Sequence, residues 1–237
     1  MYYTVNELLK YELKCEDGLL GRTNDFLFDD RDWVIRYIVA DTGTWLPKKK
    51  VLLSPKAVGK PDLVRHELEV FLTKGVIENS PELDEHAPVS RQHEIEMHKY
   101  YSWPAYWGEI VSSNQDSDSH QVQNVHLRST NELAHSTGYQ INSIDGKIGH
   151  LEDFIFDKST WKIRYIVVDT ESVLFPKKKV IFSPDWVDSI NWENKLININ
   201  HSKEEIENSP EFDPLNVHRD YETQLFTHYK REFYWES

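Results

Sequence analysis

Residues 161–170 read WKIRYIVVDT, and residues 33–42 read WVIRYIVADT. β-Branched and aromatic residues dominate both stretches, as is typical of strands. The agreement is wider than these strands, because residues 17–41 and 145–169 are identical at 14 of 25 positions with a constant offset of 128. The chain is therefore an internal tandem duplication, and each stretch predicts a strand of one copy.

The match continues beyond this strand. After one inserted residue, PKKKV at 47–51 reappears at 176–180, and IENSPE at 77–82 reappears at 206–211. Two further segments thus recur in the same order and, apart from the inserted residue, at the same spacing from the shared strand. Chance similarity would not produce this agreement.

A polar run separates the two copies. Residues 112–121 read SSNQDSDSHQ and have no apolar periodicity, as expected of a flexible linker. We predict a first repeat with a helical tail at 1–111, a polar linker at 112–125 and a second repeat with a helical tail at 126–237.

The first part of each copy has the pattern of a small antiparallel sheet. In the second copy, the aromatic run 154–156 and the β-branched run 163–168 predict two strands. Residues 157–161 between them are mostly polar and begin with Asp, which indicates a hairpin turn. Further strands are predicted at 180–182 and 197–200.

The pattern then changes to that of a helix. Ser202 and Glu205 have the spacing of a capping box, and Asp213-Pro214 suits the start of a longer helix. An apolar stripe at i, i+4 spacing follows in each copy, formed by Val217, Tyr221, Leu225 and Tyr229 and, in the first copy, by Val89, His93, Met97 and Tyr101. We expect a mainly β fold with helical tails (α+β), made of two small antiparallel β-barrels that are each followed by one or two helices.

These segments resemble the PRC-barrel family. The resemblance rests on DGKIG at 145–149, WKIRYIVVDT at 161–170 and KKVIFSP at 178–184, and it covers nearly all of both copies. It implies the small barrel of the photosynthetic reaction-centre H subunit's cytoplasmic part and of a ribosome-maturation factor, in the tandem form of stand-alone bacterial members. We expect neither the membrane anchor of the first nor the leading domain of the second, so the resemblance implies fold more than function.

Composition narrows the range of partners. The chain has a net charge of -13 and a pI of about 5.3. Because phosphate contacts supply most nucleic-acid affinity, an acidic chain argues against a general polyanion binder. Cys15 is the single cysteine, which excludes an intramolecular disulfide. Neither a signal peptide nor a long apolar run is visible, so we expect a cytoplasmic protein without membrane insertion.

Two groups of residues are candidates for binding. The triple lysines occupy matching loops and could bind anions or discourage strand pairing at a sheet edge; we favour the edge role. The tryptophans that close the two tails could anchor a partner, stack on bases or cover their own barrel; we favour the cover. The candidate residues are Lys48, Lys49, Lys50, Lys177, Lys178, Lys179, Trp107 and Trp235.

Residue patterns for catalysis are missing from the sequence. Asp25 and Asp153 adjoin predicted turns, where Asp bonds the local backbone, so structural roles are favoured. His93 and His98 are five residues apart and do not share a helix face as a zinc-binding pair must. No phosphate-binding or dinucleotide motif appears. We therefore predict no enzymatic activity, no metal and no cofactor.

The leading hypothesis is a non-catalytic binding or assembly module. Its partner is expected to be a protein or a second copy of the chain, through a homodimer or pseudo-symmetric packing of the two repeats. Two alternatives remain open: a ribosome- or RNA-associated accessory factor, and an accessory to a redox or photosynthetic electron-transfer complex. RNA binding at low salt would indicate the first alternative. A raised melting temperature with quinones or nucleotides would indicate the second.

Overall fold

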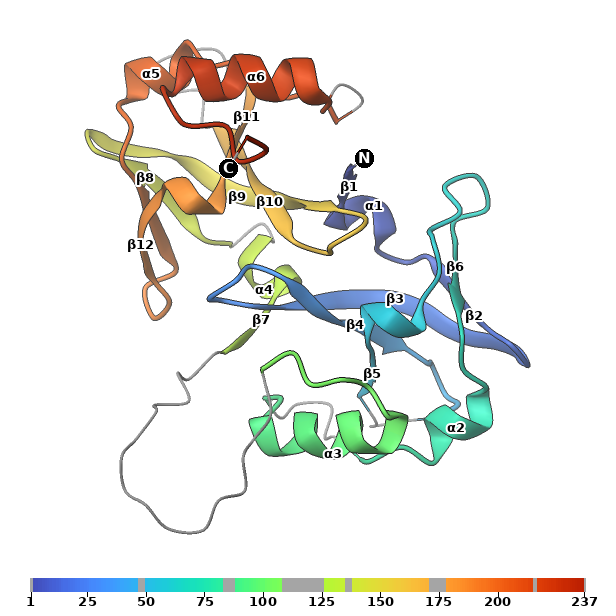
Figure 1. Cartoon of the computed structure of the whole chain (residues 1–237). Coiled ribbons are helices and arrows are strands. Elements are labelled where there is room, and N and C mark those ends of the chain that lie inside the picture. Colours follow the sequence, from blue (N-terminus) through green and yellow to red (C-terminus); the bar gives the residue numbers. More distant parts are fainter. Residues whose placement is uncertain are drawn as a thin grey trace. The chain divides into compact units, whose positions relative to one another are not determined.

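The computed structural model describes residues 2–46, 50–82, 88–107, 126–134, 138–170, 178–214 and 217–236. These residues form thirteen strands and six α-helices (Figure 1). The predicted fold class is confirmed at this level, because the chain is mainly β and the longer helices follow the strands in each copy. No helix among the described residues is long and apolar enough to cross a membrane. The predicted linker at 112–125 lies outside the described residues.

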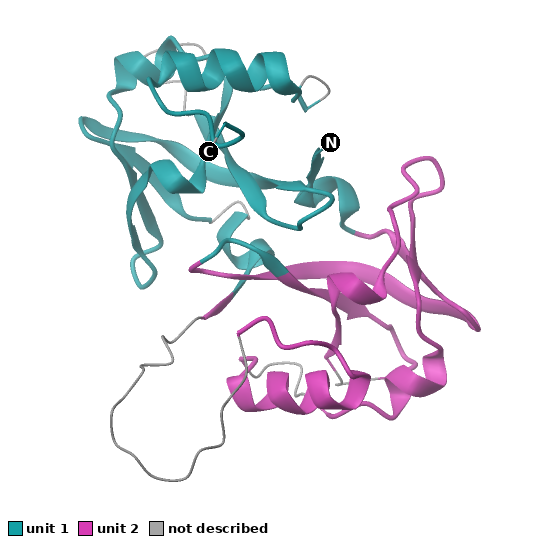
Figure 2. Ribbon diagram, viewed as in Figure 1, with its two compact units in different colours: residues 1–9, 32–35, 128–237 teal, residues 10–31, 36–127 magenta. Residues whose placement is uncertain are grey.

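The chain forms two compact units (Figure 2). Unit 1 comprises Met1–Leu9, Asp32–Ile35 and Arg128–Ser237, and unit 2 comprises Lys10–Arg31 and Arg36–Leu127. Unit 2 is thus built from the first repeat, and most of unit 1 is built from the second. The segment Tyr2–Leu9, called the arm below, lies within the predicted first repeat but belongs to unit 1.

Unit 2 contains a curved sheet and two helices (Figure 1). Its strands follow the order β5-β4-β3-β2-β6. The elements are β2 (Glu12–Cys15), β3 (Gly18–Asp29), β4 (Ile35–Asp41), β5 (Val51–Leu53), the 3-10 turn η1 (Pro55–Ala57), β6 (Glu67–Val70), α2 (Lys74–Glu78) and α3 (Arg91–Tyr101). A core of Leu27, Tyr37, Val39 and Leu52 packs against Met97 of α3. Leu127, where β7 (Leu127–Ser129) begins, packs against the same cluster.

Unit 1 repeats this arrangement in the second copy. Its strands follow the order β11-β10-β9-β8-β13-β12, with β1 paired to β9. The elements are β1 (Tyr2–Thr4), α1 (Val5–Leu8), α4 (Thr130–Ala134), β8 (Gln140–Ser143), β9 (Gly146–Asp157), β10 (Ile163–Thr170), β11 (Lys179–Phe182), η2 (Pro184–Trp186), β12 (Val187–Asn191), β13 (Leu196–Ile199), α5 (Lys203–Glu207) and α6 (Arg219–His228). The strands predicted at 154–156, 163–168, 180–182 and 197–200 correspond to β9, β10, β11 and β13.

The expectation that all strands are antiparallel is wrong for one pair in each unit. β6 runs parallel to β2, and β13 runs parallel to β8, because the last strand returns beside the first after a long connection. The sheets are therefore mixed. In unit 1 the two end strands, β11 and β12, are joined through η2 and do not pair with each other in the described sheet, so it is not a closed barrel.

The start of α5 agrees with the sequence prediction, whereas the start of α6 differs from it. The predicted capping box is confirmed, since Ser202 and Glu205 make both of its hydrogen bonds at the start of α5. The predicted helix start at Asp213-Pro214 is wrong, because α6 begins at Arg219. The backbone N–H of Phe212 donates to the carbonyl of Lys179 at 3.0 Å, which holds this segment against β11 before the helix can begin.

Candidate functional site

A buried carboxylate joins the helix, the sheet and the tail of unit 2. Glu94 of α3 is 2% exposed, and its Oε2 accepts hydrogen bonds from the hydroxyls of Tyr37 (3.0 Å) and Tyr106 (2.6 Å). Arg91, one turn earlier, places Nη1 2.9 Å from Glu94 Oε1. His98 Nε2 lies 2.9 Å from the Tyr37 hydroxyl. The Glu94 side chain thus links three parts of unit 2: β4, α3 and the tail that follows α3.

Unit 1 contains the same arrangement around Glu222 of α6. Its Oε1 accepts from the hydroxyls of Tyr165 (2.5 Å), Tyr2 (2.6 Å) and Tyr234 (2.9 Å), and Oε2 pairs with Arg219 Nη1 at 3.1 Å. Glu222 is 1% exposed. The third hydroxyl comes from the arm, so the arm completes this cluster.

The clusters are equivalent by the repeat. Each shared member recurs at an offset of 128, as Tyr37 and Tyr165, Arg91 and Arg219, Glu94 and Glu222, and Tyr106 and Tyr234. One position differs in character, because His98 is replaced by Phe226. Both copies therefore keep an Arg-Glu-Tyr set around a buried glutamate, which we call the tail cluster.

The arginine of each tail cluster makes a cation–π contact with a tryptophan of its aromatic tail. In unit 2 the Arg91 guanidinium lies 4.5 Å from the Trp107 ring centre, and Trp107 also packs on His98 at 4.6 Å. In unit 1 the Arg219 guanidinium lies 3.9 Å from the Trp235 ring centre. Cation–π contacts of this kind stabilise partly buried arginines. Both candidate tryptophans contact residues of their own units, as the predicted cover role would require.

Burial keeps the hydroxyls of the tail clusters protonated. It raises the pKa of Tyr37 and of Tyr165, and the adjacent carboxylate raises each of these pKa values further. Burial also raises the pKa of the Glu94 carboxyl. The hydroxyls therefore act as donors and the glutamate as their acceptor, which is an arrangement suited to holding a tail in place.

The described candidate lysines lie against oxygen atoms of their own unit or next to its strands. Lys178 donates to the carbonyls of Glu207 and Ser209, the second at 3.0 Å, and burial lowers its pKa. Lys179 pairs with Glu152 at 2.7 Å. Lys50 is half-buried immediately before β5. The remaining candidates, Lys48, Lys49 and Lys177, lie outside the described residues.

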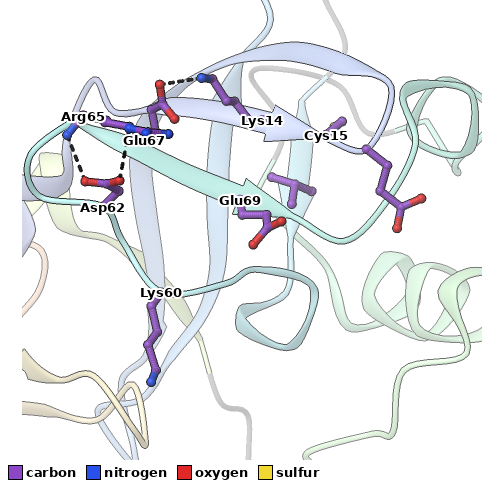
Figure 3. A pocket seen from close by; sticks show the side chains of 9 residues that line it. Lys14, Cys15, Lys60, Asp62, Arg65, Glu67 and Glu69 are labelled. Carbon is purple, nitrogen blue, oxygen red and sulfur yellow. Dashed lines mark hydrogen bonds and ion pairs between the residues drawn. The ribbon is translucent and has the colours of Figure 1, made fainter.

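A polar hollow of about 480 Å³ opens on unit 2 beside β2 and β6 (Figure 3). Its lining is Lys14, Cys15, Glu16, Lys60, Asp62, Arg65, Glu67, Glu69 and Val70. Lys14 pairs with Glu67 at 2.5 Å, and Arg65 lies 3.8 Å from Asp62. Figure 3 shows Lys60 and Glu69 apart from these pairs. The side chains of Lys60, Glu16 and Glu69 make no ion pair with any residue that the structure describes.

Strand alternation explains why the hollow is charged. Leu13 and Cys15 of β2 and Leu68 and Val70 of β6 point into the core, so the residues between them point outward. The outward set on this parallel pair is Glu12, Lys14, Glu16, Glu67, Glu69 and Phe71. We call it the β2–β6 face.

Exposed apolar side chains adjoin the lining residues of the hollow along the chain. Leu63 and Val64 lie in the turn that precedes β6, and they are 40% and 92% exposed. Phe71 is 50% exposed and lies close to Glu69, since a Cβ on Gly59 would be 3.3 Å from both side chains. Charged groups are thus flanked by exposed apolar side chains on one side of unit 2.

The second copy keeps the backbone of this face but not its charges. The registers are equivalent, with Glu12 opposite Glu67 in unit 2 and Gln140 opposite Leu196 in unit 1. The outward positions of unit 1 are Gln140, Asn142, Ile144, Leu196, Asn198 and Asn200. Several of these bond each other or neighbouring polar groups, as Gln140 Nε2 does with Asn142 Oδ1 at 2.8 Å. The charges of the hollow therefore belong to the first copy only.

The sequence alone predicts neither the tail clusters nor the charged hollow of unit 2. The Arg-x-x-Glu spacing at 91–94 and 219–222 is visible in the repeat, but a carboxylate within a helix suggests an exposed face until its tyrosine partners are known. The loss of charge in the second copy is also visible, yet only the strand pairing shows that these positions share one surface. No protein-family model matches the chain, and no curated protein matches it.

Proposed function

We propose that this chain is a non-catalytic binding or assembly module of two PRC-barrel repeats, and that the β2–β6 face of unit 2 binds a protein partner. The observation that carries the proposal is the contrast between the copies. Both retain the tail cluster, which fits a role in architecture, whereas only the first copy carries charged residues at the outward positions of this strand pair. A duplicated chain that shares its interior and differs on one equivalent face fits a scaffold with one specialised surface.

The sheet order supports the barrel assignment. In unit 1, β11 leads through the short turn η2 into β12, which is the last strand at the other end of the sheet. In unit 2, the backbone N–H of Gly59 donates to the Glu69 carbonyl at 2.8 Å, so the segment after η1 reaches β6. Both connections bring the ends of a curved sheet toward one another, as a small barrel requires.

The chemistry of the shared and exposed groups favours binding over catalysis. In the tail clusters, the carboxylates and hydroxyls are bonded to each other and buried. In the hollow, burial raises the pKa of the Cys15 thiol to about 11, so it stays protonated at neutral pH and is a poor nucleophile.

The mixture of charges favours a protein partner over RNA. Lys14, Lys60 and Arg65 are interspersed with Asp62, Glu16, Glu67 and Glu69. A phosphate backbone would meet repulsion from the carboxylates, since its affinity depends on uncompensated basic groups. A protein surface can present both signs together with apolar side chains for Val64 and Phe71.

The test is a charge reversal with a matched control. Lys60→Glu with Glu69→Lys inverts two charges of the hollow that make no ion pair with a described residue, and Ser189→Glu with Asn198→Lys introduces the same residues at the equivalent positions of unit 1. Each variant and the parent chain would be used for crosslinking and affinity capture from a native lysate, followed by mass spectrometry.

We expect one set of proteins captured by the parent and the unit 1 variant and lost with the unit 2 variant. The proposal is overturned if the unit 2 variant captures the same proteins, or if the parent captures none. It is also overturned if purified protein binds single-stranded RNA at low salt and loses that binding with the unit 2 variant.

A further inference from the structure

The arm Tyr2–Leu9 is docked on unit 1 by contacts along its whole length. β1 pairs antiparallel with β9, with Tyr2 opposite Asp157 and Thr4 opposite Ile155. Val5 and Leu8 of α1 are 2% and 1% exposed. The arm therefore adds a strand to unit 1 and fills an apolar site beside it, which is a known mode of segment recognition.

Polar contacts of Asn6 and Tyr2 give this docking its specificity. The backbone N–H of Asn6 donates to Asp153 Oδ1 at 3.1 Å, and Asn6 Nδ2 donates to the Glu152 carbonyl at 3.2 Å. At the other end, the Tyr2 hydroxyl completes the tail cluster around Glu222, and it also lies 2.7 Å from the Tyr234 hydroxyl. Unit 1 thus holds a built site for one particular segment.

The chain leaves this site through a single strained residue. Leu9 belongs to unit 1 and Lys10 to unit 2. Lys10 has a φ of 68°, a left-handed conformation that L side chains rarely adopt. On the unit 2 side it is held by its N–H donating to the Thr23 carbonyl at 2.8 Å, and the next residue, Tyr11, is buried. The hinge between arm and unit 2 is therefore short and strained.

We propose that the docking site on β9 is exchangeable, and that its second occupant is the arm of another copy of this chain. In such a strand-exchanged dimer every arm contact is kept, with the arm supplied by the partner. Opening the hinge releases the left-handed conformation of Lys10 in both chains. Short, strained hinges favour this kind of exchange. The proposal does not rest on the function proposed for the β2–β6 face.

Variants of the hinge test the proposal through the monomer–dimer equilibrium. Lys10→Gly relieves the strain in the closed form, so it should weaken dimerisation about thirty- to nine-hundredfold, because each of the two hinges releases a factor of about five to thirty. Lys10→Val keeps the N–H but disfavours positive φ, so it should strengthen dimerisation by a similar factor. Light scattering after size exclusion over a concentration series, with samples unfolded and refolded together, measures the equilibrium.

Cysteine trapping shows whether the arm is the exchanged element. In a Cys15→Ser background, one chain carries Tyr2→Cys and a second carries Asp157→Cys. These opposed positions lie within disulfide range for an antiparallel pair. A single chain with both changes is the geometric control and should form an intramolecular disulfide. Co-refolding the two single variants should give a covalent dimer.

The outcomes separate cleanly. The proposal is overturned if the parent and the Lys10→Val chain are monomeric at every concentration, or if a dimer forms without interchain disulfide while the control closes its own. If Lys10→Val fails to fold, the comparison of the parent with Lys10→Gly decides: equal dimer populations contradict the hinge argument.

Discussion

Removing the buried carboxylate of unit 1 should be far more damaging than its position on a helix suggests. In Glu222→Ala, the hydroxyls of Tyr2, Tyr165 and Tyr234 lose a charged acceptor, and Arg219 loses its partner. Each hydrogen bond to a charged group contributes about 1.5–3 kcal/mol, but bonds that share one acceptor are not additive. Arg219 is about half exposed and can be solvated, so the three hydroxyls carry the loss, and we expect a destabilisation of about 3–5 kcal/mol.

The matched change in unit 2 should be milder. Glu94→Ala also removes the acceptor of two hydroxyls, but Tyr37 keeps His98 Nε2 as a partner at 2.9 Å. We therefore expect the smaller loss for Glu94→Ala and the larger loss for Glu222→Ala. Glu222→Gln should be intermediate, because its amide oxygen still accepts while its amide nitrogen does not.

Calorimetry and urea unfolding, followed by fluorescence and circular dichroism, measure these differences. For a domain of the size of unit 1, a loss of 3–5 kcal/mol corresponds to a fall of about 10–20 °C in Tm. Glu232→Ala, an exposed glutamate in the same tail, is the control and should change stability by less than about 0.5 kcal/mol. A loss for Glu222→Ala below about 1 kcal/mol would refute the view that this carboxylate holds tail, arm and sheet together.

Three further predictions concern single positions. Gly149→Ala places a Cβ 1.9 Å from the Asp169 carbonyl oxygen and should cost more than about 3 kcal/mol in thermal unfolding, whereas Gly75→Ala in α2 has open space and should be neutral or stabilising. Burial raises the pKa of Asp153 from 3.8 to about 6, so the folded state binds this proton more tightly and stability should fall by up to about 3 kcal/mol as pH rises from 4 to 6. Asp153→Asn should flatten that part of a urea-unfolding pH series, and an unchanged slope would contradict the assignment. Burial lowers the pKa of His98, so unit 2 should lose stability as pH falls through about 6.5, and His98→Phe should remove that loss.

The sequence by itself determines the repeat and the local elements. Alternating and β-branched runs specify β9, β10 and β11, and Ser202 with Glu205 specifies the start of α5, because these patterns act between residues that are close along the chain. The resemblance to PRC barrels extends this to a two-barrel architecture, which remains a prediction beyond the open, mixed sheets that the structure describes.

Only the tertiary structure decides which of those elements meet. The Tyr2 hydroxyl reaches Glu222 across 220 positions, and the Tyr37 hydroxyl reaches Glu94 across 57. A glutamate in a helix is buried only if such donors surround it, and no local pattern specifies them. For the same reason, the arm's place on β9 and the shared surface of β2 and β6 depend on backbone pairing between distant segments, which local propensity does not encode.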